Sequence, residues 1–144
     1  MKKVLLPLVG AGIFLLDESL KNYAEENLQP GTEKKLTERI MFRRVHNQGV
    51  GFEFLSECPE EVKNLSLAVT AVVTGAGAVV VAEKGRILEK LGLTLTAAGA
   101  WSNTWDRFRR GYVVDYIGIR QKNKKFDRLT YNIGDFCIVA GSIL

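Results

Sequence analysis

The sequence predicts a mainly α-helical protein with a small β-sheet. Uncharged, largely apolar residues form four blocks at 4–16, 64–82, 91–105 and 129–144, of which only the last is interrupted by a charge, Asp135. Two polar stretches, residues 24–61 and 108–128, separate these blocks and contain segments rich in β-forming residues. With 144 residues and no internal repeat, we expect a single domain over residues 1–144.

The first block follows Lys2 and Lys3, which resembles the start of a secretory signal peptide. No small-residue cleavage pattern closes the block, and Asp17 and Lys21 continue the helix with a possible ion pair four residues apart. We therefore predict an uncleaved first spanning helix. A solvated helix end is the alternative interpretation of the same charged pair.

The second block is the only one that approaches the roughly 20 residues needed to cross a bilayer. It consists of Ala, Val, Thr and Gly rather than Leu and Phe, and its Gly75-Ala-Gly-Ala78 stretch would let a neighbouring helix approach closely. From composition alone, a buried helix or strand of a soluble core is an equally good interpretation.

The polar stretches predict the sheet. Pro30-Gly31 is a turn signal, and residues 36–45 mix charged and apolar residues in the manner of a short hairpin. Residues 112–119 are rich in β-formers and precede a predicted turn at Asn123, so a second strand pair is expected there.

Cysteine, histidine and charge exclude some functions and weaken others. Cys58, Cys137 and His46 lack metal-ligand spacing, so we predict no metal site, and a Cys–His nucleophile pair stays a minor alternative. The net charge is +4, with basic residues concentrated after Asp106. Beside apolar blocks, this cluster favours anionic lipid head groups over nucleic acid, and a solvated basic loop is the simplest alternative.

Asp115 and Asp135 lie at the polar edges of otherwise apolar stretches, where a carboxylate is costly to keep. If the fold brings them together, the two carboxyl groups cannot both ionise easily and would share a proton. Such a pair activates water in aspartic proteases. We therefore predict an aspartic dyad.

Four blocks together resemble the lipoprotein signal peptidase (signal peptidase II) family over nearly the whole chain. They are Asp17-Glu-Ser-Leu-Lys21, Asn47-Gln-Gly-Val-Gly-Phe52 with Leu55, Asn103-Thr-Trp-Asp-Arg107 continuing to Val113-Val-Asp115, and Tyr131-Asn-Ile-Gly-Asp135. The resemblance implies that Asp115 and Asp135 are the catalytic aspartates. It also implies a set of substrate-binding or dyad-supporting residues: Asp17, Lys21, Asn47, Gly49, Asn103, Asp106, Arg107 and Asn132.

The same resemblance implies a fold of four transmembrane helices with a small extracytoplasmic β-cradle, in the bacterial cytoplasmic (inner) membrane. The implied activity is an aspartic endopeptidase, without cofactor, that removes signal peptides from diacylglyceryl-modified prolipoproteins. Membrane lipids are the other expected partners, nucleic acid is not expected, and a monomer is. A catalytically degenerate or soluble relative, acting as a lipopeptide-binding or scaffold protein, is the alternative.

The chain departs from the family pattern in three places. Ser102 precedes Asn103 where the family commonly has Gly, and Gly51 stands where Ala is usual. Nine residues follow Asp135, so we expect a last helix shorter than the family's. The family topology would also put most of the 20 Lys and Arg residues outside, against the positive-inside rule.

Overall fold

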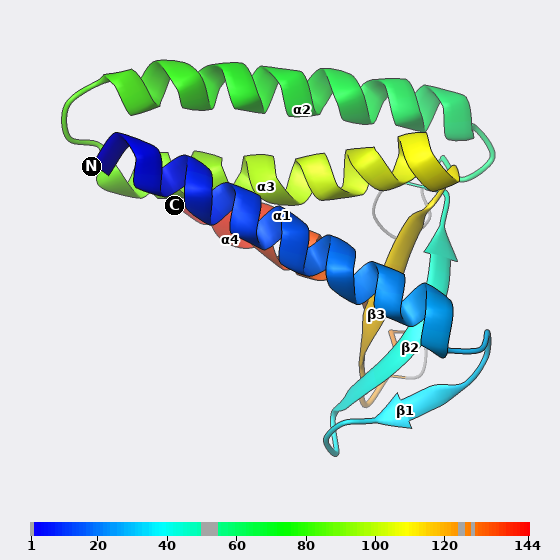
Figure 1. Cartoon of the computed structure of the whole chain (residues 1–144). Helices are drawn as coiled ribbons and strands as arrows, with labels where there is room; N and C mark the ends of the chain where they lie inside the picture. The colour runs from blue at the N-terminus through cyan, green and yellow to red at the C-terminus, as the bar shows by residue number, and fades with distance from the viewer. Residues whose placement is uncertain (1, 50–54, 124–125, 128) are drawn as a thin grey trace.

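The computed structural model describes residues 2–49, 55–123, 126–127 and 129–144. Within these residues, four helices and four strands follow one another in the order α1, β1, β2, α2, α3, β3, β4, α4. The helices lie side by side, and the sheet crosses one end of the bundle, opposite the end that holds both termini (Figure 1). Val50, Gly51 and Phe52 of the second motif, and the basic residues Lys124, Lys125 and Arg128, lie outside the described residues.

Helix α1 (Lys2–Asn27) joins the first apolar block to the Asp17–Lys21 pair in one continuous element. Twenty-six residues give a helix of about 39 Å, long enough to cross a bilayer. The turn at Pro30-Gly31 follows as predicted, with the Thr32 N–H bonded to the Gln29 carbonyl at 3.2 Å and Gly31 at φ 79°. Positive φ is cheap for glycine, so the chain reverses there.

Helix α2 (Pro59–Ala82) begins with Pro59, which needs no N–H partner at a helix start, and Glu60 and Glu61 favour the positive end of the helix dipole. Among the described residues it is the one helix that is long and apolar enough to span a membrane by length and composition. Only 11% of its apolar window is buried in the protein. That exposure argues against the core helix of a soluble protein.

Helix α3 (Ile87–Arg110) contacts each of the other three helices and ends at Gly111, where φ is 82°. Helix α4 (Ile133–Ile143) packs closely on it through glycines. A Cβ on Gly92 would come within 2.7 Å of the Gly141 carbonyl oxygen, and a Cβ on Gly99 would overlap that of Gly134. Absent side chains therefore let the two backbones touch.

The sheet has the order β1-β2-β3-β4 and is antiparallel throughout. Its strands are β1 (Glu33–Lys35), β2 (Ile40–Asn47), β3 (Val113–Ile119) and β4 (Thr130–Tyr131). Both predicted strand pairs are present, although β1 lies just before the predicted residues 36–45, and they join in one sheet because β2 pairs with β3. Asn47 lies opposite Val113, and Val45 lies opposite Asp115, so the sheet brings the second and third motifs together.

The burial pattern is inverted relative to a soluble domain. The apolar cluster of fully buried residues is small, centred on Ala24, Val114 and Tyr116. Many apolar helix residues are exposed, such as Val72 at 72% and Leu8 at 62%. The polar residues, in contrast, gather inside the bundle. The buried polar or charged residues are Asp17, Glu18, Lys21, Thr70, Ser102, Asn103, Thr104, Asp106, Asp115 and Asn132.

Candidate active site

Asp115 and Asp135 come from different elements and meet at Asn132. Asp115 lies in the middle of β3, and Asp135 lies in the first turn of α4. The side-chain amide of Asn132 donates to Asp115 Oδ1 at 2.8 Å, while its backbone N–H donates to Asp135 Oδ2 at 3.0 Å. One residue thus holds both carboxyl groups.

The local sequence around Asn132 explains how Asp135 is fixed. Asn132 caps α4 by accepting from the Asp135 N–H at 2.8 Å, and the Asp135 side chain bonds back to the Asn132 N–H. This reciprocal pair is a capping box, with Asp in the third helical position. The helix N-terminus also favours a negative charge there. The capping contacts therefore stabilise the carboxylate form of Asp135 against the cost of its burial.

Two further amides hold the remaining carboxyl oxygens. Asn47, at the end of β2, donates to Asp115 Oδ2 at 3.2 Å, and Asn103 on α3 donates to Asp135 Oδ1 at 2.9 Å. The Asn47 side chain is itself oriented by the Gly49 N–H, which donates to its Oδ1 at 2.9 Å. All four carboxyl oxygens are thereby occupied and directed.

The environment of Asp115 favours its protonated form. The residue is 3% exposed. Burial, followed by the neighbouring charge of Asp135, raises the pKa of Asp115 from 3.8 to about 8, although the amides of Asn47 and Asn132 oppose the shift. At neutral pH, this environment therefore favours one proton held by the pair.

Lys21 is the centre of a buried charge cluster behind the two aspartates. Its Nζ lies 3.1 Å from Asp17 and 3.3 Å from Asp106, and both it and these partners have no exposed side-chain surface. It also donates to Asn103 Oδ1 at 3.1 Å. Because Asn103 in turn donates to Asp135, the cluster fixes the orientation of that amide. The solvated alternative for the Asp17–Lys21 pair is wrong.

Arg107 and Asp106 link α3 to the loops around the site. Arg107 donates to the Gly49 carbonyl at 2.9 Å and to the Asn103 carbonyl at 3.2 Å. Asp106 accepts from the Val114 N–H at 3.0 Å and from the Arg110 side chain. The end of β2 and the start of β3 are thus attached to the same turn of α3.

Two hydroxyl groups that the sequence analysis did not place in the site hold Asp17. Ser102 donates to Asp17 Oδ2 at 2.7 Å, and Tyr116 donates to Asp17 Oδ1 at 2.6 Å. The Tyr116 oxygen also lies 3.3 Å from the Ile133 N–H, which donates to Asp17 at 3.0 Å. Burial and the Asp17 charge raise the pKa of Tyr116, so it remains a donor. The sequence feature that could have identified Tyr116 is its position next to Asp115 in a segment rich in β-forming residues.

The two aspartates open into a cavity of about 800 Å³ between α2, α3, α4 and the sheet. Its polar end contains Asn47, Asn103, Arg107, Asp115 and Asp135. Most of the remaining lining is aliphatic, with residues such as Leu65, Val69, Val73, Ile138 and Val139 beside the hydroxyl groups of Ser66, Thr70 and Thr96. The cavity therefore combines a proton-transfer pair with room for an apolar ligand.

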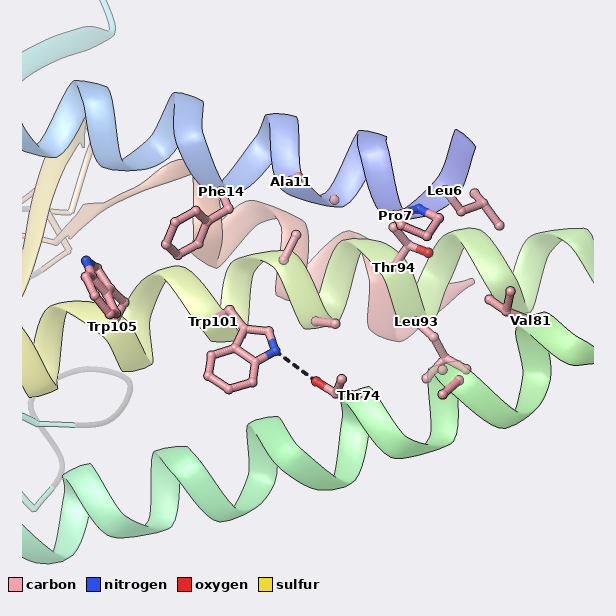
Figure 2. Close-up of a pocket in the computed structure, with 15 residues that line it drawn as sticks. Leu6, Pro7, Ala11, Phe14, Thr74, Val81, Leu93, Thr94, Trp101 and Trp105 are labelled. Carbon is pink, nitrogen blue, oxygen red and sulfur yellow. Dashed lines mark hydrogen bonds between the residues drawn. The ribbon is translucent and has the colours of Figure 1, made fainter. Parts of the chain in front are cut away.

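A second hollow of about 610 Å³ lies between α1, α2 and α3. Figure 2 shows Phe14, Trp101 and Trp105 along it, with the Trp101 indole donating to Thr74 Oγ1 at 2.9 Å. The described residues that line it include no ionisable side chain. Acid–base chemistry is therefore confined to the first cavity of these two.

The cysteines and the histidine do not form a second candidate site. His46 stacks on Tyr112, with ring centroids 3.9 Å apart, and contacts Glu25 at 2.6 Å. Cys58 precedes α2, and Cys137 lies on α4. Among the described residues, no hydrogen bond joins His46 to either thiol. The Cys–His alternative has no geometric support.

Comparisons with known structures define the class of fold. Two solved structures, both described as a bacterial membrane enzyme determined by the in meso method, match with TM-scores of 0.82 and 0.78. Each match covers 96% of this chain at 20% identity, and the shares of the other chains are 82% and 87%. The fold is that of a bacterial membrane enzyme.

Sequence comparisons then give the family. A family model described as signal peptidase (SPase) II matches residues 9–144. The lipoprotein signal peptidase of Allorhizobium ampelinum is 31% identical over 131 residues, which is 90% of this chain and 78% of the relative. That of a Sulfurihydrogenibium species is 29% identical over 150 residues, 100% of this chain and 91% of the relative. The chain belongs to the signal peptidase II family of aspartic peptidases.

Proposed function

We propose that this chain removes signal peptides from diacylglyceryl-modified prolipoproteins, with Asp115 and Asp135 as its catalytic pair. The observation that carries the proposal is the bridge through Asn132, which holds one oxygen of each carboxyl group at 2.8 and 3.0 Å. Two carboxyl groups held by one residue, at the polar end of a large cavity, are the arrangement that shares a proton and activates water.

The two environments support different starting roles. Asp115 holds the proton, because its pKa is raised to about 8. Asp135, in the capping box of α4, is ionised and takes a proton from water. The resulting hydroxide attacks the scissile carbonyl carbon, and Asp115 gives its proton to the developing oxyanion. Asp135 then protonates the leaving nitrogen, Asp115 recovers its proton, and the C–N bond breaks.

The surrounding residues hold the two carboxyl groups in a fixed orientation. Asn47 and Asn103 act as donors to the outer carboxyl oxygens, and Lys21 orients Asn103 from behind. Asp17, Asp106, Gly49 and Arg107 support the same arrangement through the contacts described above. Preorganised donors of this kind cost no reorientation during the reaction.

The cavity and the helix surfaces support the substrate class and the location. The aliphatic part of the cavity suits the apolar segment and acyl chains of a lipid-modified peptide. In the proposed topology the four helices lie in the cytoplasmic membrane, with the sheet and the aspartates at the extracytoplasmic side. The long exposed apolar surfaces of α1 and α2 favour a lipid surrounding.

A cleavage assay on a lipidated prolipoprotein, with the full chain in detergent or bilayer, tests the proposal. Asp115→Asn and Asp135→Asn remove the transferable proton with little change of shape, so the rate falls by about 100- to 10,000-fold. Asp127→Asn is the matched control, because the Asp127 side chain accepts only the Gln121 N–H among the interactions of the described residues. A dyad variant that cleaves at the parent rate would leave a lipopeptide-binding or scaffold role as the better interpretation.

A further inference from the structure

Five exposed basic side chains lie at the far end of the sheet. We call this group the basic tip, and it consists of Lys34, Lys35, Arg39, Arg120 and Lys122. Strand pairing brings the segments that carry them to the same end of the sheet: Lys35 lies opposite Met41, and the Arg120 N–H donates to the Arg39 carbonyl at 2.7 Å. Within the part of the chain that the structure describes, none of the five makes an ion pair.

Two neighbouring cations on β2, in contrast, have partners within the protein. Arg43 pairs with Glu33 at 2.8 Å and donates to the carbonyls of Asp127 and Leu129, so its charge is used inside the sheet. Arg44 donates to the Glu25 carbonyl at 2.9 Å. The cations of the basic tip, in contrast, have no ion pair or side-chain hydrogen bond with the other described residues.

The basic tip also carries exposed apolar side chains. Leu36 is 57% exposed, Phe126 is 45% exposed and Ile40 is 39% exposed. Two acidic residues, Glu38 and Asp127, lie in the same region, but they do not balance five cations. A mixture of Lys, Arg and exposed apolar or aromatic residues is typical of a membrane–water interface.

The arrangement of the sheet in Figure 1 agrees with contact between the basic tip and lipid. The strands run across the end of the helix bundle, and the β1–β2 turn extends beyond α1, away from the helices. With the helices across a bilayer, as the proposed function requires, the sheet lies along the membrane surface. The basic tip then lies above lipid rather than above the bundle.

We propose that the basic tip binds the phosphate groups of anionic phospholipids beside the enzyme. Lys and Arg near an anionic membrane surface each contribute a factor of about five in association. This inference rests on the proposed function, since it needs the helices to span the membrane. It also gives a physical reason for the many cations on the sheet side, which the positive-inside rule does not predict.

The test measures lipid selectivity of the full chain in phosphatidylcholine bilayers that contain a trace of spin-labelled phosphatidylglycerol or spin-labelled phosphatidylcholine. We expect the parent protein to immobilise the anionic label preferentially, by about fivefold, with the preference falling towards one in about 1 M salt because exposed charges are screened. The variant Lys35→Gln with Arg39→Gln and Arg120→Gln loses the preference.

The matched control, Lys84→Gln with Arg86→Gln and Lys90→Gln, removes the same charge from the α2–α3 connection and the first turn of α3, at the opposite end, and keeps the preference. Equal preference in the parent and the tip variant overturns the proposal, as does equal loss in both variants. Salt-sensitive binding of an oligonucleotide that only the tip variant loses, without a lipid preference in the parent, would assign the surface to nucleic acid instead. Cleavage in neutral bilayers, measured in parallel, separates the outcomes: an active parent without lipid preference refutes only the basic tip.

Discussion

At the scale of single residues, burial of the Asp115 carboxyl group raises its pKa, and this lowers the stability of the folded protein as the pH rises. Its pKa is about 8 in the folded protein against an ordinary value of 3.8. Between these values the folded protein keeps a proton that the unfolded chain has released. Raising the pH through this window therefore lowers the free energy of unfolding, and the loss is complete above the folded pKa.

Asp115→Asn removes that penalty, since an amide does not ionise. The side-chain amides of Asn47 and Asn132 both donate to Asp115, and one of them would then face the new NH₂ group. This loss of a hydrogen bond offsets part of the gain in stability. We expect a net stabilisation of about 1 to 3 kcal/mol at pH 8 and little or none below pH 4. Thermal unfolding of parent and variant in the same detergent, at a series of pH values, measures this difference. A difference independent of pH would mean that Asp115 is ionised in the folded protein.

Tyr116 is a positioning residue that connects Asp17 to the start of α4. Tyr116→Phe removes the hydroxyl that donates to Asp17 at 2.6 Å, and we expect a loss of about 1 to 2 kcal/mol in stability. Because Asp135 lies in the same turn of α4 as Ile133, kcat should fall several-fold and the alkaline limb of the pH–rate profile should shift, with KM little changed.

Tyr23→Phe is the control for this substitution, since Tyr23 is 45% exposed, its ring contacts Phe42, and its hydroxyl has no hydrogen bond to the other described residues. It should leave rate and pH profile as in the parent. If Tyr116→Phe lowers stability but leaves the pH profile unchanged, the hydroxyl is structural and does not position Asp135.

The sequence predicted the ion pair of Asp17 and Lys21 because both lie on one helix at a spacing of four residues. It did not predict the partners from α3 and β3, since Ser102 and Tyr116 are more than 80 residues away and come together only in the folded chain. Ser102 was noted as a small replacement for glycine, but its hydroxyl has two carboxylate partners, Asp17 and Glu18. Contacts between elements are set by tertiary packing.

At the scale of elements, hydropathy located the helices better than it located their ends. Hydropathy predicts one continuous apolar block at residues 129–144. In the structure, however, Thr130 and Tyr131 pair with β3, and the helix begins at Ile133. A two-residue strand leaves no periodic signal in a sequence. The capping pattern of Asn132 and Asp135, which does mark the boundary, was assigned to the active site alone.

The close packing of α3 on α4 gives a prediction at this scale. A Cβ on Gly99 would overlap the Gly134 carbonyl and lie 3.0 Å from Ile138 Cγ1, so Gly99→Ala must push α4 away from α3. Asp135 then moves from Asn103, now 2.9 Å away. We expect at least about tenfold lower kcat, with about 1 to 3 kcal/mol lost in stability.

Gly75→Ala on α2 is the matched control, because a Cβ there meets nothing within 4 Å. Replacing glycine by alanine in a helix interior is otherwise favourable by about 1 kcal/mol, so this variant should be as active as the parent. Equal activity of the two variants would show that α4 tolerates displacement and that the α3–α4 contact does not set the dyad geometry.

At the scale of the whole molecule, polar residues lie inside the bundle and apolar residues outside, so the solvent for the helices is lipid. Charged groups such as Lys21 are buried with partners, whereas Leu8 and Val72 are more than half exposed. We expect the chain to sediment with membranes, to resist a wash at high pH that releases peripheral proteins, and to need detergent for extraction. A soluble monomer in a detergent-free lysate would contradict this expectation and would favour a soluble relative, because α1 and α2 would then expose large apolar surfaces to water.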